Sequence, residues 1–492
     1  MKSSFCTDIK NVFDSLNEYV RYAHFKSNMH LDASVNGETD FDILVDRQSQ
    51  EEFVSIMLVN NFVRMKTAVV NSYEAVEDWI GFSVEHSCLI HFHVHWEFVV
   101  GQPHVKQYSI PIAQRVLEDT KIVSIGGVNI RTVSPEMELQ ILVIRSLLKF
   151  RKRELPRILL NKRILAPDFD AELAWLDTQT LGKKISEQNL YYSSLEITQV
   201  LSLIENNSVF RYLLCVISYR KCVKDFLILN TIEVLMSRYW NEFCKRLLPR
   251  IFFVHRTVKR SPQAGGLSMH LVGIDGAGKS SLQASLHKML GKKLDVRSVY
   301  FGLGSGKKSW HRAILEIGRR KSTRVQSIGT SNTSHSGLGL VKKIKRAVYA
   351  VSVATEKRSK LKQVIALRSM GFIVICDRYP QLQSIGLNDG YILDDQNFSY
   401  GIWKLFYNLE RKIMSVFERY YCDVLFFMEI SAETAYDRKR EESIDILEQK
   451  RHQLTKIVES DSRARRTVSL DSGASPSRLT YEVVSVIWKY LK

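Results

Sequence analysis

Apolar and polar positions along the chain change their period twice. Up to about residue 133, short helical patterns mix with strand-like runs such as FDILV (41–45) and LIHFHVHWEFVV (89–100). From Ser134 the apolar spacing becomes helical and stays so to about residue 258. Ser134 stands where a helix N-cap is expected, followed by proline at the first helical position and glutamates in the first turn. The first part therefore predicts an α+β domain, and the second predicts a helical connector.

A third pattern begins after RTVKRSPQAGG (256–266), whose charge, proline and glycines predict a linker. Beyond it, apolar runs typical of buried strands alternate with helical stretches. The runs are LSMHLVGI (267–274), FIVIC (372–376) and DVLFFMEI (423–430), and the first helical stretch is SSLQASLHKML (280–290). Buried strands separated by helices predict a parallel sheet with helices on both faces. The chain is therefore expected to be α/β, with domains at 1–133, 134–260 and 267–492.

A glycine-rich motif follows the first of these strands. Gly273-Ile-Asp-Gly-Ala-Gly278-Lys279-Ser280 is a complete G-x-x-x-x-G-K-S between a predicted strand and a predicted helix. In this motif backbone N–H groups surround phosphates, the lysine reaches the β- and γ-phosphates, and the serine ligates Mg²⁺. The sequence therefore predicts ATP and Mg²⁺ as cofactors. The expected nucleotide-binding residues are Gly273, Asp275, Gly276, Ala277, Gly278, Lys279, Ser280 and Ser281.

An acidic residue that could complete this site is Asp377, at the end of the apolar run FIVIC. A carboxylate at the end of a strand beside a phosphate-binding loop can hold Mg²⁺ or one of its waters. Ser280 and Asp377 are thus the metal ligands expected in this part of the chain. Arg378 follows directly.

Four segments resemble the thymidylate kinase family in order and spacing. They are LVGIDGAGKSSL (271–282), ALRSMGFIVICDRY (366–379), MEISAETAYDRKR (428–440) and the closing VSLDSGASPSRLTYEVVSVI (468–487). ATEKR (354–358) also corresponds to a family helix that carries a functional arginine. The resemblance covers about residues 267–492, and it implies a P-loop kinase domain.

The resemblance implies five catalytic side chains. Arg378 would grip the acceptor phosphate, and Asp377 would support both Arg378 and the surroundings of the Mg²⁺. Arg438 and Arg440 would cover the ATP phosphates, and they would supply the positive charge that some relatives carry on an arginine inside the loop. With Lys279, these residues imply a nucleoside monophosphate kinase that uses ATP and Mg²⁺, in the simplest case converting dTMP to dTDP.

The acceptor side departs from the family pattern. FGLGSG (301–306) stands where the family has an acidic R-E-P-G-G segment, and PQLQSIGLNDG (380–390) replaces a segment that contributes to holding thymine. Ile446 stands at the place of a further arginine. Two alternatives therefore remain open. One is a kinase for a non-nucleotide acceptor such as a sugar or glycan precursor, and the other is an ATP-binding scaffold without turnover.

Two carboxylates, Asp40 and Asp42, lie two residues apart at the run FDILV. This spacing places both on one face of a strand, as two-metal nucleotidyl transfer requires. The segment resembles the G-x-S-D-x-D-hh-V motif of the nucleotidyltransferase superfamily, which implies Asp40 and Asp42 as metal ligands. His93 stands where that resemblance expects a third carboxylate, so the activity of this domain is left open. His91, His93 and His95 share one strand face, which allows either a metal site or a polar face lining a cleft.

Charge and composition narrow the expected partners. The 492-residue chain has a formal net charge of +18, with +13 at 305–363 and +7 at 145–163. Clustered positive charge without a recognised nucleic-acid fold favours a nucleotide and a small phosphorylated acceptor over nucleic acid. No run reaches the roughly 20 apolar residues of a membrane-spanning helix. Seven irregularly spaced cysteines are typical of a reducing compartment. A cytoplasmic protein is expected, and a homodimer is compatible with the sequence.

Overall fold

The computed structural model describes residues 8–243, 259–302, 340–378, Leu382, 390–460 and 464–491. Within the first range, the residues not described are 69–72, 74, 84, 87, 104, 162–163, 165 and 181–187. The chain divides into two compact units, residues 1–263 and 264–491, and each is described by itself. Residues 303–339, which include much of the basic stretch 305–363, and most of the segment 380–390 lie outside the described residues.

The first unit contains a mixed sheet that, in the described part of the chain, has eight strands in the order β10-β3-β4-β5-β2-β1-β9-β8. Its strands are β1 (Tyr22–His24), β2 (Phe41–Val45), β3 (Val63–Thr67), β4 (Val76–Ser83), β5 (Cys88–His95), β8 (Thr120–Ile125), β9 (Val128–Val133) and β10 (Arg260–Pro262). β6 (Val99–Val100) and β7 (Tyr108–Ser109) form a separate pair. The strands predicted at 41–45 and 89–100 are confirmed, the second being divided into β5 and β6.

Alternation along the strands gives this sheet two different faces. On β5, Phe92 and Val94 pack into a core that also contains Phe13 of α1 (Ile9–Tyr19) and Phe53 of α3 (Gln50–Val59). Leu44 of β2 points to the opposite face and belongs to a second core, built mostly from helices. The histidines of β5 alternate with Phe92 and Val94, so they lie on the face of Leu44.

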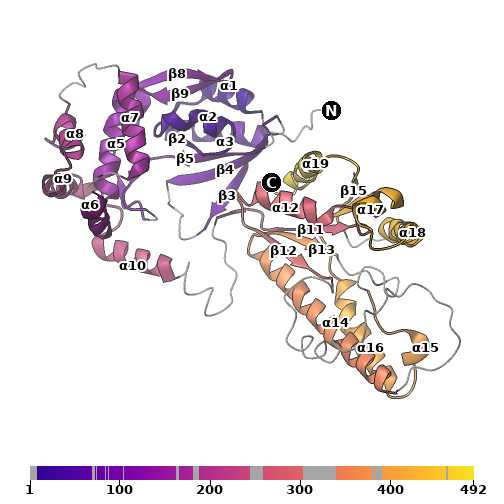
Figure 1. The fold of residues 1–492 in the computed structure, drawn as a ribbon. Helices are drawn as coiled ribbons and strands as arrows, with labels where there is room; N and C mark the ends of the chain where they lie inside the picture. Colours follow the sequence, from indigo (N-terminus) through magenta and orange to yellow (C-terminus); the bar gives the residue numbers. More distant parts are fainter. Residues whose placement is uncertain are drawn as a thin grey trace. The chain divides into compact units, whose positions relative to one another are not determined.

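The helices after residue 133 share their core with the sheet. Ser134 caps α5 (Pro135–Lys149) by accepting a hydrogen bond from the Met137 N–H, as the sequence predicts. α5 to α9 lie together beside the sheet (Figure 1). The helices predicted as a connector and the amino-terminal sheet therefore belong to one compact unit. The helices of this unit are α1 (Ile9–Tyr19), α2 (Leu31–Val35), α3 (Gln50–Val59), α4 (Ala113–Glu118), α5, α6 (Leu155–Asn161), α7 (Pro167–Thr180), α8 (Ile197–Glu205), α9 (Val209–Cys222) and α10 (Thr231–Glu242).

The segment predicted as a linker contains a strand. Arg260–Pro262 forms β10, which pairs antiparallel with β3 at the edge of the sheet. The proline is tolerated because an edge strand has one side without a ladder partner. The division between the two units falls after Gln263, within the predicted linker, and the pairing brings Arg260 into the first unit.

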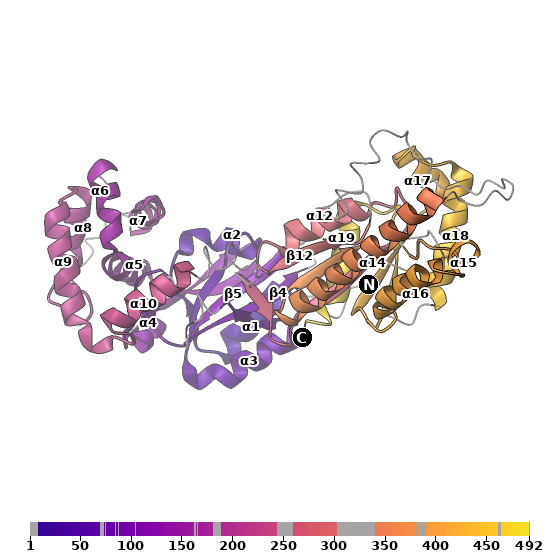
Figure 2. The same cartoon turned by 90° about the horizontal axis from the view of Figure 1, so that it is seen from below.

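The second unit is built on a parallel sheet with the strand order β12-β13-β11-β14-β15 among the described residues. The predicted mixed α/β class and parallel sheet are confirmed. α12 and α19 lie together on one face of this sheet and α14 lies on the other (Figures 1 and 2). The strands are β11 (Leu267–Val272), β12 (Val296–Tyr300), β13 (Ile373–Asp377), β14 (Val424–Glu429) and β15 (Thr467–Asp471). The helices are α12 (Lys279–Leu290), α14 (Leu340–Ser369), α15 (Asp395–Phe398), α16 (Trp403–Met414), α17 (Ala432–Arg438), α18 (Ile444–Ser460) and α19 (Pro476–Trp488).

The position of β11 in this order matters for function. The chain leaves β11 toward β12 and β13 on one side and later reaches β14 and β15 on the other. In open α/β sheets, ligands bind at the carboxyl ends of the strands where the strand order changes direction. The glycine-rich motif follows β11 at that edge. No helix in the described part of the chain combines the length and apolar character needed to cross a membrane.

Candidate functional sites

The glycine-rich loop joins β11 to α12, as the sequence predicts. Gly276 and Gly278 have φ angles of 90° and 83°, which side-chain-bearing residues rarely adopt. A Cβ atom on Gly276 would lie 2.5 Å from the carbonyl oxygen of Ala435 in α17. The loop therefore needs glycine for its backbone path and for the close approach of α17. Ala277 is buried within the loop, and Ser280 and Ser281 lie exposed in the first turn of α12.

Lys279, the first residue of α12, folds its side chain back over the loop. Its Nζ donates hydrogen bonds to the carbonyl oxygens of Gly273 and Ile274, both at 2.9 Å. Burial lowers the pKa of Lys279, although the carboxylates of Asp275 and Asp377 oppose this. The ammonium group thus lies inside the loop, where it is partnered by carbonyl oxygens that a phosphate could replace.

Asp377 ends β13 and pairs in register with Leu271 of β11, one strand away from the loop. It is 5% exposed, and among the described residues its Oδ1 atom has no hydrogen-bond partner. Burial raises the pKa of this carboxyl group. A buried, unpartnered carboxylate oxygen is costly unless a cation or a donor joins it. Ser280 and Asp377 therefore fit the Mg²⁺ site that the motif implies.

Arg378 has a φ of 57°, in the left-handed region that is unusual for a residue with a side chain. Its Nη2 lies 2.6 Å from Oδ1 of Asp275 in the loop. Burial acts to raise the pKa of Asp275, but the charge of Arg378 outweighs it, and the pKa is lowered. The predicted acceptor-binding arginine is thus held at the loop by a carboxylate from the loop itself.

The two arginines predicted to cover the nucleotide phosphates differ in their surroundings. Arg438 is the last residue of α17, and its Nη2 donates to the carbonyl oxygen of Ser472 at 3.0 Å. Its Nη1 would lie 4.0 Å from a Cβ atom placed on Gly278. Arg440 lies two residues beyond the end of α17, and both arginines are exposed. The structure therefore places Arg438, but not Arg440, next to the glycine loop.

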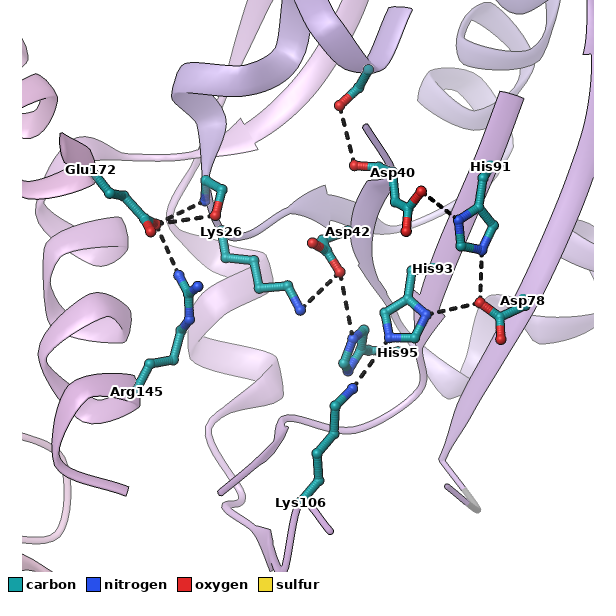
Figure 3. Close-up of polar contacts among 12 residues, drawn as sticks. Lys26, Asp40, Asp42, Asp78, His91, His93, His95, Lys106, Arg145 and Glu172 are labelled. Atoms are coloured by element: carbon teal, nitrogen blue, oxygen red, sulfur yellow. Dashed lines mark hydrogen bonds and ion pairs between the residues drawn. The ribbon is translucent and has the colours of Figure 1, made fainter. Parts of the chain in front are cut away.

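In the first unit, Asp40 and Asp42 have different partners. Asp40 Oδ1 lies 2.7 Å from His91 Nδ1, whereas Asp42 Oδ1 lies 2.8 Å from Lys26 Nζ (Figure 3). Among the described residues, the groups of three side chains that could hold a metal ion include Asp42 but not Asp40. Asp40 and Asp42 thus contact different partners on this sheet face, one an imidazole and the other an ammonium group.

Asp78, which the sequence analysis did not single out, lies at the centre of this cluster. On β4 it stands opposite His93 in the antiparallel ladder. Its Oδ1 accepts hydrogen bonds from His91 at 2.7 Å and His93 at 3.0 Å, and lies 2.9 Å from Arg260 Nε. Although burial opposes it, these groups hold the pKa of Asp78 well below its usual range. Alternation in VEDWIGF (76–82) could have predicted a strand there, but nothing in that run indicates which strand it pairs with or that Asp78 faces the histidines.

Lysines also line the histidine face. Lys26 pairs with Asp42, and Lys106 Nζ lies 3.2 Å from His93 Nε2 (Figure 3). Burial, together with the charge of Lys26, lowers the pKa of Lys106 to about 7. Burial opposes ionisation of Asp42, but Lys26 brings the pKa of Asp42 down to about 2. The cluster thus combines carboxylates, imidazoles and ammonium groups on one buried sheet face.

A buried carboxyl group on α5 supports the loop that follows β1. Glu138 is 1% exposed and accepts hydrogen bonds from the backbone N–H and the side-chain amide of Asn28, at 2.8 and 2.7 Å. Asn28 in turn bonds His24. Burial raises the pKa of Glu138 to about 7, which the bonds from Asn28 only partly offset. Ionisation of Glu138 is therefore unfavourable in the folded unit.

This raised pKa predicts a pH dependence of stability. Because the folded pKa lies above the unfolded value, the stabilising contribution is complete at low pH and is lost as pH rises toward about 7. The free energy of unfolding should fall by roughly 3 kcal/mol from this group between about pH 4.5 and 7. Urea unfolding of the full chain and of Glu138→Gln, across this range, should show a difference that changes with pH. Glu136→Gln, on the exposed side of α5, should track the wild type, and parallel curves for Glu138→Gln would contradict the assignment.

Comparison with known proteins places the chain near proteins that are themselves little described. No family model matches the sequence. The chain is 28% identical over 209 residues to "Uncharacterized ATP-binding protein YghS" of Escherichia coli K12, covering 39% of this chain and 84% of that protein. It is 27% identical over 210 residues to "Uncharacterized ATP-binding protein YghR" of the same strain, covering 39% and 80%.

Proposed function

We propose that the second unit binds ATP and transfers its terminal phosphoryl group to a phosphorylated small-molecule acceptor, in the simplest case a nucleoside monophosphate such as dTMP. The observation that carries this proposal is the convergence of Lys279, Asp377 and Arg438 on one glycine loop at the carboxyl edge of a parallel sheet. The names of the two relatives support the coarser part, ATP binding. The thymidylate kinase resemblance supports the finer part.

Each residue has a role that follows from its position. Backbone N–H groups of the loop and the ammonium of Lys279 would bind the β- and γ-phosphates. Ser280 and Asp377 would hold Mg²⁺, which supplies charge neutralisation at the phosphate oxygens when bound. Arg438 would stabilise negative charge that develops on the transferred group. Since phosphoryl transfer needs mainly positioning and charge stabilisation, these side chains would supply the main contributions that the chemistry requires.

Arg378 is assigned to the acceptor. In the described structure its guanidinium is paired with Asp275, at the edge of the loop. Two oxygens of an acceptor phosphate can accept parallel hydrogen bonds from a planar guanidinium, as a carboxylate can, so a phosphate can compete for this arginine. The proposal therefore favours acceptors that carry a phosphate group over those that carry only hydroxyls.

A panel of acceptors tests the proposal. The full chain is incubated with ATP and Mg²⁺, and ADP formation is measured without acceptor, with each nucleoside monophosphate, and with sugars and sugar phosphates. We expect at least one phosphorylated acceptor to stimulate ADP formation well above the rate of Lys279→Ala. Stimulation only by an unphosphorylated sugar would contradict the acceptor class. Tight ATP binding with no stimulation by any acceptor would contradict phosphoryl transfer and favour a scaffold.

A further inference from the structure

Three ligand-type side chains converge on the histidine face of the first unit. Asp42 of β2 and His93 of β5 are in register across neighbouring parallel strands, and His95 lies two residues further on the same face. Each offers one ligand atom, and these atoms lie within 4.8 Å of one another. The three side chains come from the two central strands of the sheet, so the backbone that carries them is rigidly paired (Figure 3).

The hydrogen bond from His93 to Asp78 orients one ring nitrogen toward this group. His93 Nδ1 lies 3.0 Å from Asp78 Oδ1, so Nδ1 carries the proton and Nε2 presents a lone pair. The Nε2 atom faces the ammonium of Lys106 at 3.2 Å, which is the geometry of a donor to that lone pair. A carboxylate bonded to the far nitrogen is the usual outer partner of a metal-binding histidine.

His95 is the member whose burial most needs a partner. It is fully buried, and among the described residues neither of its ring nitrogens has a hydrogen bond. Its Nε2 atom lies 3.9 Å from Asp42 Oδ1, and its ring makes a T-shaped contact with Phe25. Buried polar atoms without partners are rare and costly in native proteins. A metal ion bound by His95, His93 and Asp42 would give the Nε2 atom of His95 a partner.

A second overlapping group, Asp78, His91 and His93, is less suited to bind a metal ion. Asp78 Oδ1 already accepts from two histidines and faces Arg260, and its Oδ2 accepts from Thr67. The carboxylate is therefore committed to donors on both oxygens. Asp78 acts as the positioning residue of the first group rather than as a ligand.

We propose that Asp42, His93 and His95 form a site for a single divalent transition-metal ion of the Zn²⁺ class. Two imidazoles favour Zn²⁺ and its neighbours over Mg²⁺, which prefers oxygen ligands and water. Three protein ligands, two histidines and one carboxylate, also leave an open coordination position, as in catalytic rather than structural zinc sites. This site lies in the first unit and is independent of the phosphoryl transfer proposed for the second.

The lysines beside the site lead to a distinctive expectation. Lys26 lies 2.8 Å from Asp42, so a metal ion must compete with its ammonium group for the same carboxylate. Removing the positive charge with Lys26→Met should therefore strengthen Zn²⁺ binding, by at least about tenfold. Removing the carboxylate charge with Asp42→Asn should weaken it. The two substitutions break the same ion pair, so general damage to the fold cannot give effects of opposite sign.

The test is a calorimetric Zn²⁺ titration of the metal-free full chain, with Co²⁺ absorption as a second readout of the ligand field. We expect one Zn²⁺ per wild-type chain and no comparable binding of Mg²⁺. Loss of a residue that supports a metal ligand typically weakens metal binding by about 10–100-fold, and Asp78→Asn should fall in that range. Asp42→Asn and His95→Gln remove a ligand and should weaken Zn²⁺ binding by more. Circular dichroism of each variant establishes that it folds.

His91→Gln distinguishes the two overlapping groups. Retained Zn²⁺ binding in His91→Gln, with loss in His95→Gln, supports the proposed ligands. Four results would each overturn the proposal. They are the opposite pattern in these two variants, no Zn²⁺ binding by the wild type, equal binding of Mg²⁺ and Zn²⁺ by the wild type, and weaker Zn²⁺ binding in Lys26→Met. If His95→Gln does not fold, the opposite effects expected for Lys26→Met and Asp42→Asn still decide the question.

Discussion

Replacing Lys279 with alanine is expected to lower acceptor-stimulated ADP formation by about 10²–10³-fold, the loss typical of removing one preorganised charge-stabilising donor. The ammonium lies inside the glycine loop, where it donates to the carbonyl oxygens of Gly273 and Ile274. Truncation removes positive charge from the loop in which the phosphates are expected to bind. Steady-state ADP formation and equilibrium ATP binding measure the effect.

Lys288→Ala is the matched control for this substitution. Lys288 lies on the same helix, α12, but is exposed and near its carboxyl end. Its removal should leave both turnover and ATP binding unchanged. Equal losses in Lys279→Ala and Lys288→Ala would mean that the helix, and not the ammonium in the loop, accounts for the effect.

Arg438→Ala should produce the second large effect, about a 10³-fold fall in kcat with a smaller change in the KM for ATP. Arg438 ends α17, whose backbone packs against Gly276, and its guanidinium approaches Gly278. Under the proposed phosphoryl transfer, a charge in this position would stabilise the transferring group more than bound ATP. Initial rates at varied ATP concentration separate the two parameters.

Arg419→Ala, an exposed arginine elsewhere in the same unit, should leave kcat unchanged. Arg440→Ala is informative as well, because the resemblance assigns Arg440 the same role while the structure places it two residues beyond the end of α17. A fall in kcat for Arg440→Ala that matches Arg438→Ala would mean that this segment moves toward the loop on binding. An unchanged kcat for Arg438→Ala would contradict the role given to it here.

The phosphate loop could be predicted from sequence because its determinants are local. An apolar strand, glycines at positions that need positive φ, and a helix that begins at Lys279 are all contained in a short segment. Asp377 was predictable for a related reason, because parallel strands end at one edge of a sheet and FIVIC ends in this carboxylate. Local patterns and one rule of sheet geometry were sufficient.

The histidine face could be predicted only in part. Alternation along β5 predicted that His91, His93 and His95 share a face, and the structure has them so. The carboxylate that orients two of them, Asp78, comes from β4 by antiparallel pairing, and its register depends on the whole sheet. Arg260 reaches the cluster because β10 joins the far edge of the same sheet, a contact between residues distant in sequence. Sequence patterns carry no signal for such pairings.

The most direct test of the central claim follows the terminal phosphate of ATP. The full chain is incubated with Mg²⁺, ATP labelled in its γ-phosphate and a mixture of nucleoside monophosphates, and the labelled products are separated. Phosphoryl transfer predicts that the label appears in a nucleoside diphosphate, and that Lys279→Ala forms almost none. Label that stays in ATP, or appears only as inorganic phosphate, would contradict the assignment of this unit as a phosphotransferase.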